Sequence, residues 1–89
     1  MAYRILWTRV FEEDFKKLEE KFKKRVVLKT EFLAQNPQQA ERVAFAPLGL
    51  DNLSKYRIGD YRLLFWLDRK KEILTLYKIN RRDQIYKKL

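Results

Sequence analysis

Hydrophobic and polar residues alternate along residues 55–67, and this period of two is typical of β-strands. Gly59-Asp60 divides the stretch, and Gly59 can supply the positive φ that a type II′ turn requires. A two-residue loop places Arg57 directly opposite Arg62. One face of this hairpin is then apolar and is expected to enter the core: Tyr56, Ile58, Tyr61, Leu63, Phe65 and Leu67. The other face carries Lys55, Arg57, Arg62, Leu64 and Trp66.

A helical period dominates the N-terminal half of the chain. Residues 3–7 alternate weakly and predict a short strand, after which Thr8 can cap a helix. The apolar stripe of that helix is Phe11, Phe15, Leu18 and Phe22. Helical spacing continues to Asn36, because Pro37 disfavours helical backbone angles in the residue before it. A bend between two helical segments is expected near residues 20–24.

Three strands are expected after a connection at residues 37–54. They span 55–58, 61–68 and 72–79, and the last is apolar on both sides, as a central strand should be. Pairing Asp68 with Glu72 sets the predicted register of the last two strands. Lys78 then lies opposite Arg62 on the open face, whereas a shift by one residue would turn Lys78 into the core.

The composition is that of a folded protein, with 46% hydrophobic and 15% aromatic residues in 89. We predict one α+β domain over residues 1–89: an N-terminal strand, a helical hairpin and a curled antiparallel sheet (β-α-α-β-β-β), followed by a basic C-terminal tail. The absence of cysteine excludes disulfides and favours an intracellular protein. Without a signal-peptide pattern or a run of about 20 apolar residues, a cytoplasmic protein with no membrane partner is expected.

Positive charge is concentrated towards the C-terminus. The net charge is +9, and residues 55–89 hold eleven Lys/Arg against four Asp/Glu. Like charges directly opposite each other cost about 0.2–1 kcal/mol, so a cationic sheet face beside an aromatic favours an anionic partner such as nucleic acid. An acidic protein or a membrane surface remains an alternative. A solvated helix face is the simpler interpretation of the cationic run Lys21, Lys23, Lys24 and Arg25.

Four cations and one phenol are predicted to converge on the open face: Arg57, Arg62, Lys78, Arg82 and Tyr86. Arginine suits bidentate phosphate contact, and tyrosine or tryptophan can stack on an unpaired base. Because the chain has no histidine and no acidic spacing typical of a metal site, neither a metal nor a cofactor is expected. Metal-free RNA cleavage remains feasible, in which the ribose 2′-hydroxyl attacks its own phosphate. Adjacent cations would lower the pKa of a tyrosine acting as the base.

Each of these residues also has a plainer interpretation. Tyr86 can pack on the edge of the sheet, and Arg57 and Arg62 can extend into solvent. Trp66 can be ordinary packing beneath a loop. Only the combination of these residues favours a nucleic-acid site.

One run of the chain resembles the central signature of the RelE/ParE toxin superfamily. The run is Tyr56-Arg57-Ile58-Gly59-Asp60-Tyr61-Arg62-Leu63-Leu64-Phe65. The expected order of elements agrees with the superfamily, as do Ile5-Leu6-Trp7-Thr8 and Leu48-Gly49-Leu50. The resemblance implies a toxin of a type II toxin–antitoxin pair. RelE-like members cut mRNA in the ribosomal A site without a metal and leave a 2′,3′-cyclic phosphate.

By position, the resemblance also implies roles for single residues. Arg62 matches the arginine that contacts the scissile phosphate in the family. Arg82 matches the arginine that stabilises charge or acts as the acid. Tyr86 matches the tyrosine that acts as the base or as a stacking group. The predicted RNA-binding residues are Lys55, Arg57, Trp66, Lys78 and Arg81. The implied partners are a cognate antitoxin, forming a hetero-oligomer with the toxin, and mRNA in the A site.

The tail departs from the pattern of many relatives, which carry Gly-His-Arg-Arg before the final tyrosine. Here the stretch is Asn80-Arg81-Arg82-Asp83, so a mechanism that uses the histidine is impaired, whereas one that uses arginine and tyrosine is not. Three functions therefore stay open: an mRNA endoribonuclease, a ParE-like poison of DNA gyrase, and a catalytically inactive antitoxin- or RNA-binding module.

Overall fold

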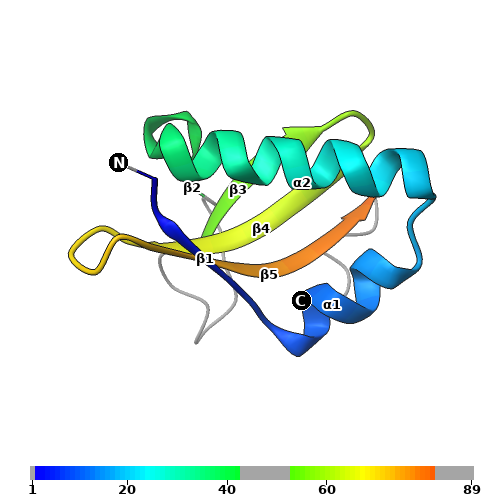
Figure 1. Ribbon diagram of the computed structural model, residues 1–89, viewed down its shortest axis with the longest axis horizontal. Helices are drawn as coiled ribbons and strands as arrows, with labels where there is room; N and C mark the ends of the chain where they lie inside the picture. Colours follow the sequence, from blue (N-terminus) through cyan, green and yellow to red (C-terminus); the bar gives the residue numbers. More distant parts are fainter. Residues whose placement is uncertain (1, 43–52, 82–89) are drawn as a thin grey trace.

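The computed structural model describes residues 2–42 and 53–81, which form one mixed sheet and two helices (Figure 1). The elements are β1 (Arg4–Trp7), α1 (Arg9–Lys16), α2 (Glu20–Gln35), a 3₁₀ turn (Pro37–Gln39), β2 (Glu41–Arg42), β3 (Leu53–Ile58), β4 (Tyr61–Asp68) and β5 (Ile73–Arg81). The strand order is β1-β5-β4-β3-β2, with β1 parallel to β5 and the other pairs antiparallel. The predicted α+β class and the central place of the last strand are confirmed. The short β2 lies in a segment predicted as a connection.

The helical half begins and ends close to the predicted positions. Thr8 has extended backbone angles, and its hydroxyl accepts a hydrogen bond from the Phe11 amide at 3.1 Å, as a helix N-cap does. The last helix ends at Gln35, directly before Asn36 and Pro37. The bend predicted at residues 20–24 is instead at residues 17–19. This break comes early because the first helix closes with a tight turn, in which the Leu18 amide donates to the Phe15 carbonyl and Leu18 enters the core.

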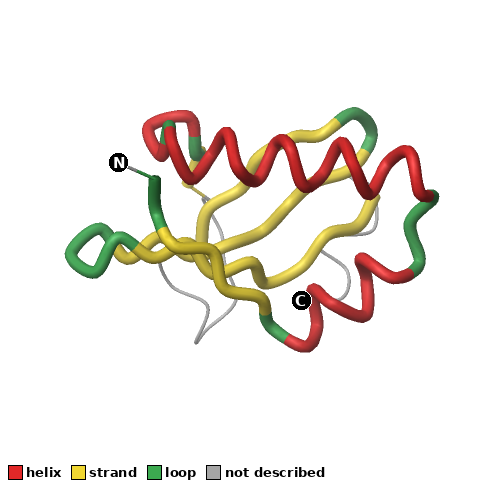
Figure 2. The backbone as a smooth tube through the Cα atoms, in the orientation of Figure 1, coloured by secondary structure: helices red, strands yellow, loops and turns green. Residues whose placement is uncertain are grey.

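One face of the sheet is buried under the helices, and α2 runs along it (Figure 2). Val26 and Leu33 of α2 are buried in the same cluster as Leu63 and Phe65 of β4. All six hairpin residues predicted to face the core belong to this cluster or pack against it. The hairpin alternation therefore identified the core face correctly.

The β3–β4 hairpin has the predicted register, with Arg57 opposite Arg62. Gly59 has a φ of +59°, in the left-handed region that glycine adopts at little cost. The arrangement of charges predicted for β3 and β4 therefore holds in the structure.

The predicted register of β4 and β5 is wrong. Asp68 pairs with Ile73 rather than with Glu72, and Arg62 pairs with Asn80 rather than with Lys78. The turn is longer because one Asp68 carboxylate oxygen accepts the Lys70 and Lys71 amides at 3.1 and 3.0 Å. A β-bulge between Leu64 and Phe65 then shifts the pairing by one more residue.

Candidate nucleic-acid interface

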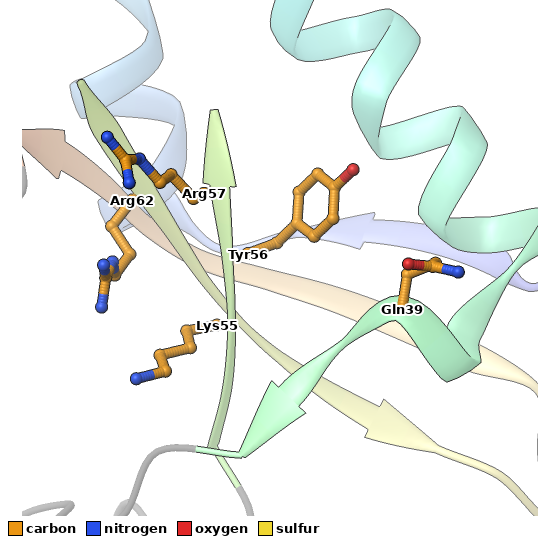
Figure 3. A pocket seen from close by; sticks show the side chains of 5 residues that line it. All are labelled: Gln39, Lys55, Tyr56, Arg57 and Arg62. Atoms are coloured by element: carbon orange, nitrogen blue, oxygen red, sulfur yellow. The ribbon is translucent and has the colours of Figure 1, made fainter. Parts of the chain in front are cut away.

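The face of the sheet opposite the helices carries three cations that lie close together. Lys55 and Arg57 of β3 and Arg62 of β4 line a pocket of about 340 Å³, together with Tyr56 and Gln39. In Figure 3 the three cationic side chains lie on one side of the strands, whereas Tyr56 extends towards Gln39. Because Gln39 follows α2 in the chain, the 3₁₀ turn supplies one polar wall of a pocket otherwise built from the hairpin.

Arg57 is held along the hairpin turn. Its Nε donates to the Gly59 carbonyl at 3.1 Å, although the side chain is otherwise exposed. Arg57 lies directly opposite Arg62, so two guanidinium groups share a short stretch of the same face. An anion between them would relieve a like-charge repulsion of about 0.2–1 kcal/mol. The geometry of the hairpin therefore suits a phosphate group.

The carboxylates of the described residues form their ion pairs elsewhere. Lys16 pairs with Glu12 and Glu13, and Lys23 pairs with Glu20, all on the helices. Lys55 and Arg57 therefore have no ion-pair partner within residues 2–42 and 53–81. Their positive charge remains available to an incoming anion.

Lys78 lies on the same sheet face as Arg62 but outside the pocket. It pairs with Leu64, and only 8% of its surface is exposed. Lys78 is therefore on the predicted face but is buried there and is not opposite Arg62. The longer turn and the bulge each shift the pairing by one residue, which places Lys78 opposite Leu64. A buried lysine is costly unless its charge is matched, and an anion bound on this face would supply that match.

Trp66 also lies on the open face, where its ring packs against Tyr77 with centroids 4.8 Å apart. Both rings are half-buried over Leu53 and Leu64. This contact agrees with the packing alternative that the sequence left open for Trp66. Tyr77 was not among the predicted site residues, because alternation from Lys78 on the open face assigns Tyr77 to the core face, whereas the bulge places both residues on the open face.

The remaining predicted residues lie apart from the pocket or outside the described residues. Arg81 pairs with Tyr61, whose ring packs on Phe22 of α2, so Arg81 lies at an exposed end of the helix-covered face. Arg82 and Tyr86 lie outside the described residues. Two pocket residues were missed, Tyr56 and Gln39, because the sequence assigned the first to the core and the second to a connection.

The described residues contain neither a metal-ligand cluster nor a membrane-spanning helix. No group of three or more His, Cys, Asp or Glu gathers there in a way that could hold a metal ion. In the same ranges, no helix has the length and apolar character that crossing a membrane requires.

Comparison with known proteins places the chain among toxins. Residues 5–86 match the sequence profile of a family described as the ParE toxin of type II toxin-antitoxin system, parDE. No match was found among curated proteins.

Several solved structures share the fold. The RelBE2 toxin–antitoxin complex of Mycobacterium tuberculosis superposes with a TM-score of 0.78 and 20% identity, covering 92% of this chain and 93% of that one. The archaeal RelE–RelB complex of Pyrococcus horikoshii has a TM-score of 0.73 and 18% identity, with 92% and 97% covered. The isolated E. coli RelE toxin has a TM-score of 0.73 and 16% identity, with 98% and 94% covered.

Proposed function

The chain belongs to the ParE toxin family of type II toxin–antitoxin systems, and we propose that it is a ribosome-dependent, metal-free mRNA endoribonuclease that inhibits translation. The observation that supports this most is the pocket in which Lys55, Arg57 and Arg62 meet on one sheet face. Three cations from two strands suit a phosphate backbone better than an uncharged partner. The RelE-like fold of the chain agrees with this proposal.

The proposed reaction is an internal transfer of the phosphodiester bond. The ribose 2′-oxygen forms a bond to phosphorus, its proton passes to a base, and the bond to the 5′-oxygen breaks as that oxygen gains a proton. Arg62 and Arg57 would stabilise the extra negative charge on the phosphorane. By resemblance, Tyr86 supplies the base and Arg82 the acid. The products are a 2′,3′-cyclic phosphate and a free 5′-hydroxyl.

We further propose that a cognate antitoxin binds this chain to form a hetero-oligomer, as in the solved complexes of M. tuberculosis and P. horikoshii. An acidic segment would cover the cations of the open face. An apolar groove of about 160 Å³ between β1 and the helices, lined by Ile5, Trp7, Phe11 and Val27 among others, suits the apolar side of an amphipathic partner. Antitoxin binding that does not weaken with salt would contradict the electrostatic part of this proposal.

A second candidate is poisoning of DNA gyrase. It is favoured by the family profile itself, since the profile that matches describes ParE toxins. The charge of the open face does not separate the two functions, because DNA and RNA both present phosphates. Arg57, Arg62, Arg82 and Tyr86 together nevertheless favour the endoribonuclease, because the gyrase branch usually lacks the combined arginine and tyrosine set.

Primer extension on an mRNA translated by purified ribosomes tests the proposal. We expect cuts with the wild-type protein that weaken in Arg62→Ala, Arg82→Ala and Tyr86→Ala. A gyrase supercoiling assay with the same preparations is the parallel measurement. Growth arrest with inhibited supercoiling and no mRNA cuts would overturn the proposal in favour of gyrase. If the protein neither cuts mRNA nor inhibits supercoiling, it is an inactive binding module.

A further inference from the structure

The bulge in β5 decides which side chains reach the cationic face. Phe65 pairs with Leu76 and Leu64 pairs with Lys78, so Tyr77 has no partner on β4. Two consecutive residues of β5 thus share the open face, with Tyr77 against Trp66 and Lys78 opposite Leu64. Without the extra residue, Lys78 would pair with Leu63, which is completely buried in the core. The bulge therefore returns Lys78 and Asn80 to the face of Arg62.

The other edge of β5 changes its neighbour at the same place. β1 pairs with β5 only as far as Trp7 and Leu76. Beyond that point, the side chains of the N-cap residue and of the last turn of α1 bond the main chain of β5. The Thr8 hydroxyl donates to the Tyr77 carbonyl at 2.9 Å, and the Asp14 carboxylate accepts from the Ile79 amide at 3.2 Å. The main-chain groups on both sides of Lys78 are satisfied by these two residues.

We propose that Thr8 and Asp14 are positioning residues, which hold the β5 bulge and so direct Lys78 and Asn80 towards the cationic face. Bulges commonly re-aim side chains next to functional sites. Asp14 forms no ion pair with another described residue, so its charge is directed at the Ile79 amide rather than at a lysine of α1. The effect on RNA cleavage rests on the proposed function, whereas the effect on the bulge does not.

The test separates the loss of a bond from the loss of a charge. Asp14→Ala removes the acceptor of the Ile79 amide, whereas Asp14→Asn keeps an oxygen acceptor without the charge. Glu13→Ala is the control, because it removes a neighbouring carboxylate that is 59% exposed and bonds only Lys16 among the described residues. By NMR, we expect exchange of the Ile79 amide to be about tenfold faster in Asp14→Ala. The cross-strand contact between Leu64 and Lys78 should weaken in the same variant. Both signals should be retained in Asp14→Asn and Glu13→Ala.

The same variants are then assayed for mRNA cleavage on ribosomes. We expect kcat in Asp14→Ala to fall about tenfold with KM little changed, and Asp14→Asn to restore most of it. Unchanged Ile79 exchange and an intact Leu64–Lys78 contact in Asp14→Ala would overturn the proposal, even if cleavage fell. If the wild-type protein cuts no RNA, the proposed function fails and the NMR comparison still decides the role of Asp14. Should Asp14→Ala not fold, the Leu64–Lys78 contact is compared between Thr8→Val and Thr8→Ser, because serine keeps the hydroxyl that both donates to Tyr77 and caps α1. An intact contact in Thr8→Val would overturn the proposal.

Discussion

The two faces of the sheet differ in what lies against them, although neighbouring residues of the same strand contribute side chains to both faces. On β4, Leu63 and Phe65 are fully buried under the helices, whereas the alternate positions turn Arg62, Leu64 and Trp66 to the open face. The covered face gains most of its stability from apolar burial, whereas the open face has only the small apolar cluster of Leu53 and Leu64 and collects cations that repel one another. Substitutions on the two faces should therefore change different measurements.

The largest effect is expected on the covered face. Phe65→Ala removes a completely buried aromatic side chain and should lower the free energy of unfolding by about 3–5 kcal/mol. Urea denaturation followed by fluorescence measures this change. Arg57→Ala, an exposed substitution on the opposite face, is the control and should cost much less. Equal losses in the two variants would contradict the division between the faces.

The next effect is expected on the open face and in activity. Arg62→Ala should reduce ribosome-dependent cleavage by about 10²–10³-fold, because a charge directed at the phosphorane is lost. Arg62→Lys should recover part of the rate, since lysine keeps the charge but not the bidentate geometry. Single-turnover cleavage measures both variants. A wild-type rate in Arg62→Ala would remove this residue from the reaction.

The turn that joins β3 and β4 has its own requirement. Gly59 has a φ of +59°, and an added Cβ would lie 3.3 Å from Nη1 of Arg25 on α2. Gly59→Ala should cost about 1–2 kcal/mol of stability. Gly59→Asn should cost less, because asparagine tolerates left-handed angles better. Thermal unfolding compares the two, and a larger loss with asparagine would show that side-chain size decides the outcome instead.

The smallest effect concerns the salt dependence of RNA binding. Arg57→Gln should reduce the slope of log K against log salt by about one, the value expected for one lost phosphate contact. Lys24→Gln on α2 removes a charge from an exposed helix position and should leave the slope unchanged. Filter binding of a short mRNA at several salt concentrations measures both. Equal changes would mean that net charge, rather than the open face, governs binding.

The sequence was sufficient where the structure depends on local interactions. Alternation along 55–67 and the Gly59 turn predicted the core face and the meeting of Arg57 with Arg62. Pro37 predicted the end of α2 for the same reason, because its effect acts on the preceding residue.

Side-chain hydrogen bonds, both local and long-range, explain what could not be predicted. The register of β5 depends on the Asp68 carboxylate in the turn and on bonds from Thr8 and Asp14, more than 60 residues away in the chain. Gln39 reaches the pocket only because the 3₁₀ turn folds back beside β3. Side-chain hydrogen bonds of this kind leave no periodic pattern in a sequence.

Photo-crosslinking of mRNA to the protein on programmed ribosomes tests the central claim most directly. An mRNA that carries 4-thiouridine at the A-site codon is irradiated, and the crosslinked peptides are identified by mass spectrometry. We predict crosslinks on β3 and β4, in the peptides that contain Lys55 and Trp66. Crosslinks confined to the cationic peptides of α2, around Lys21 and Lys24, would contradict the assignment of RNA to the open face.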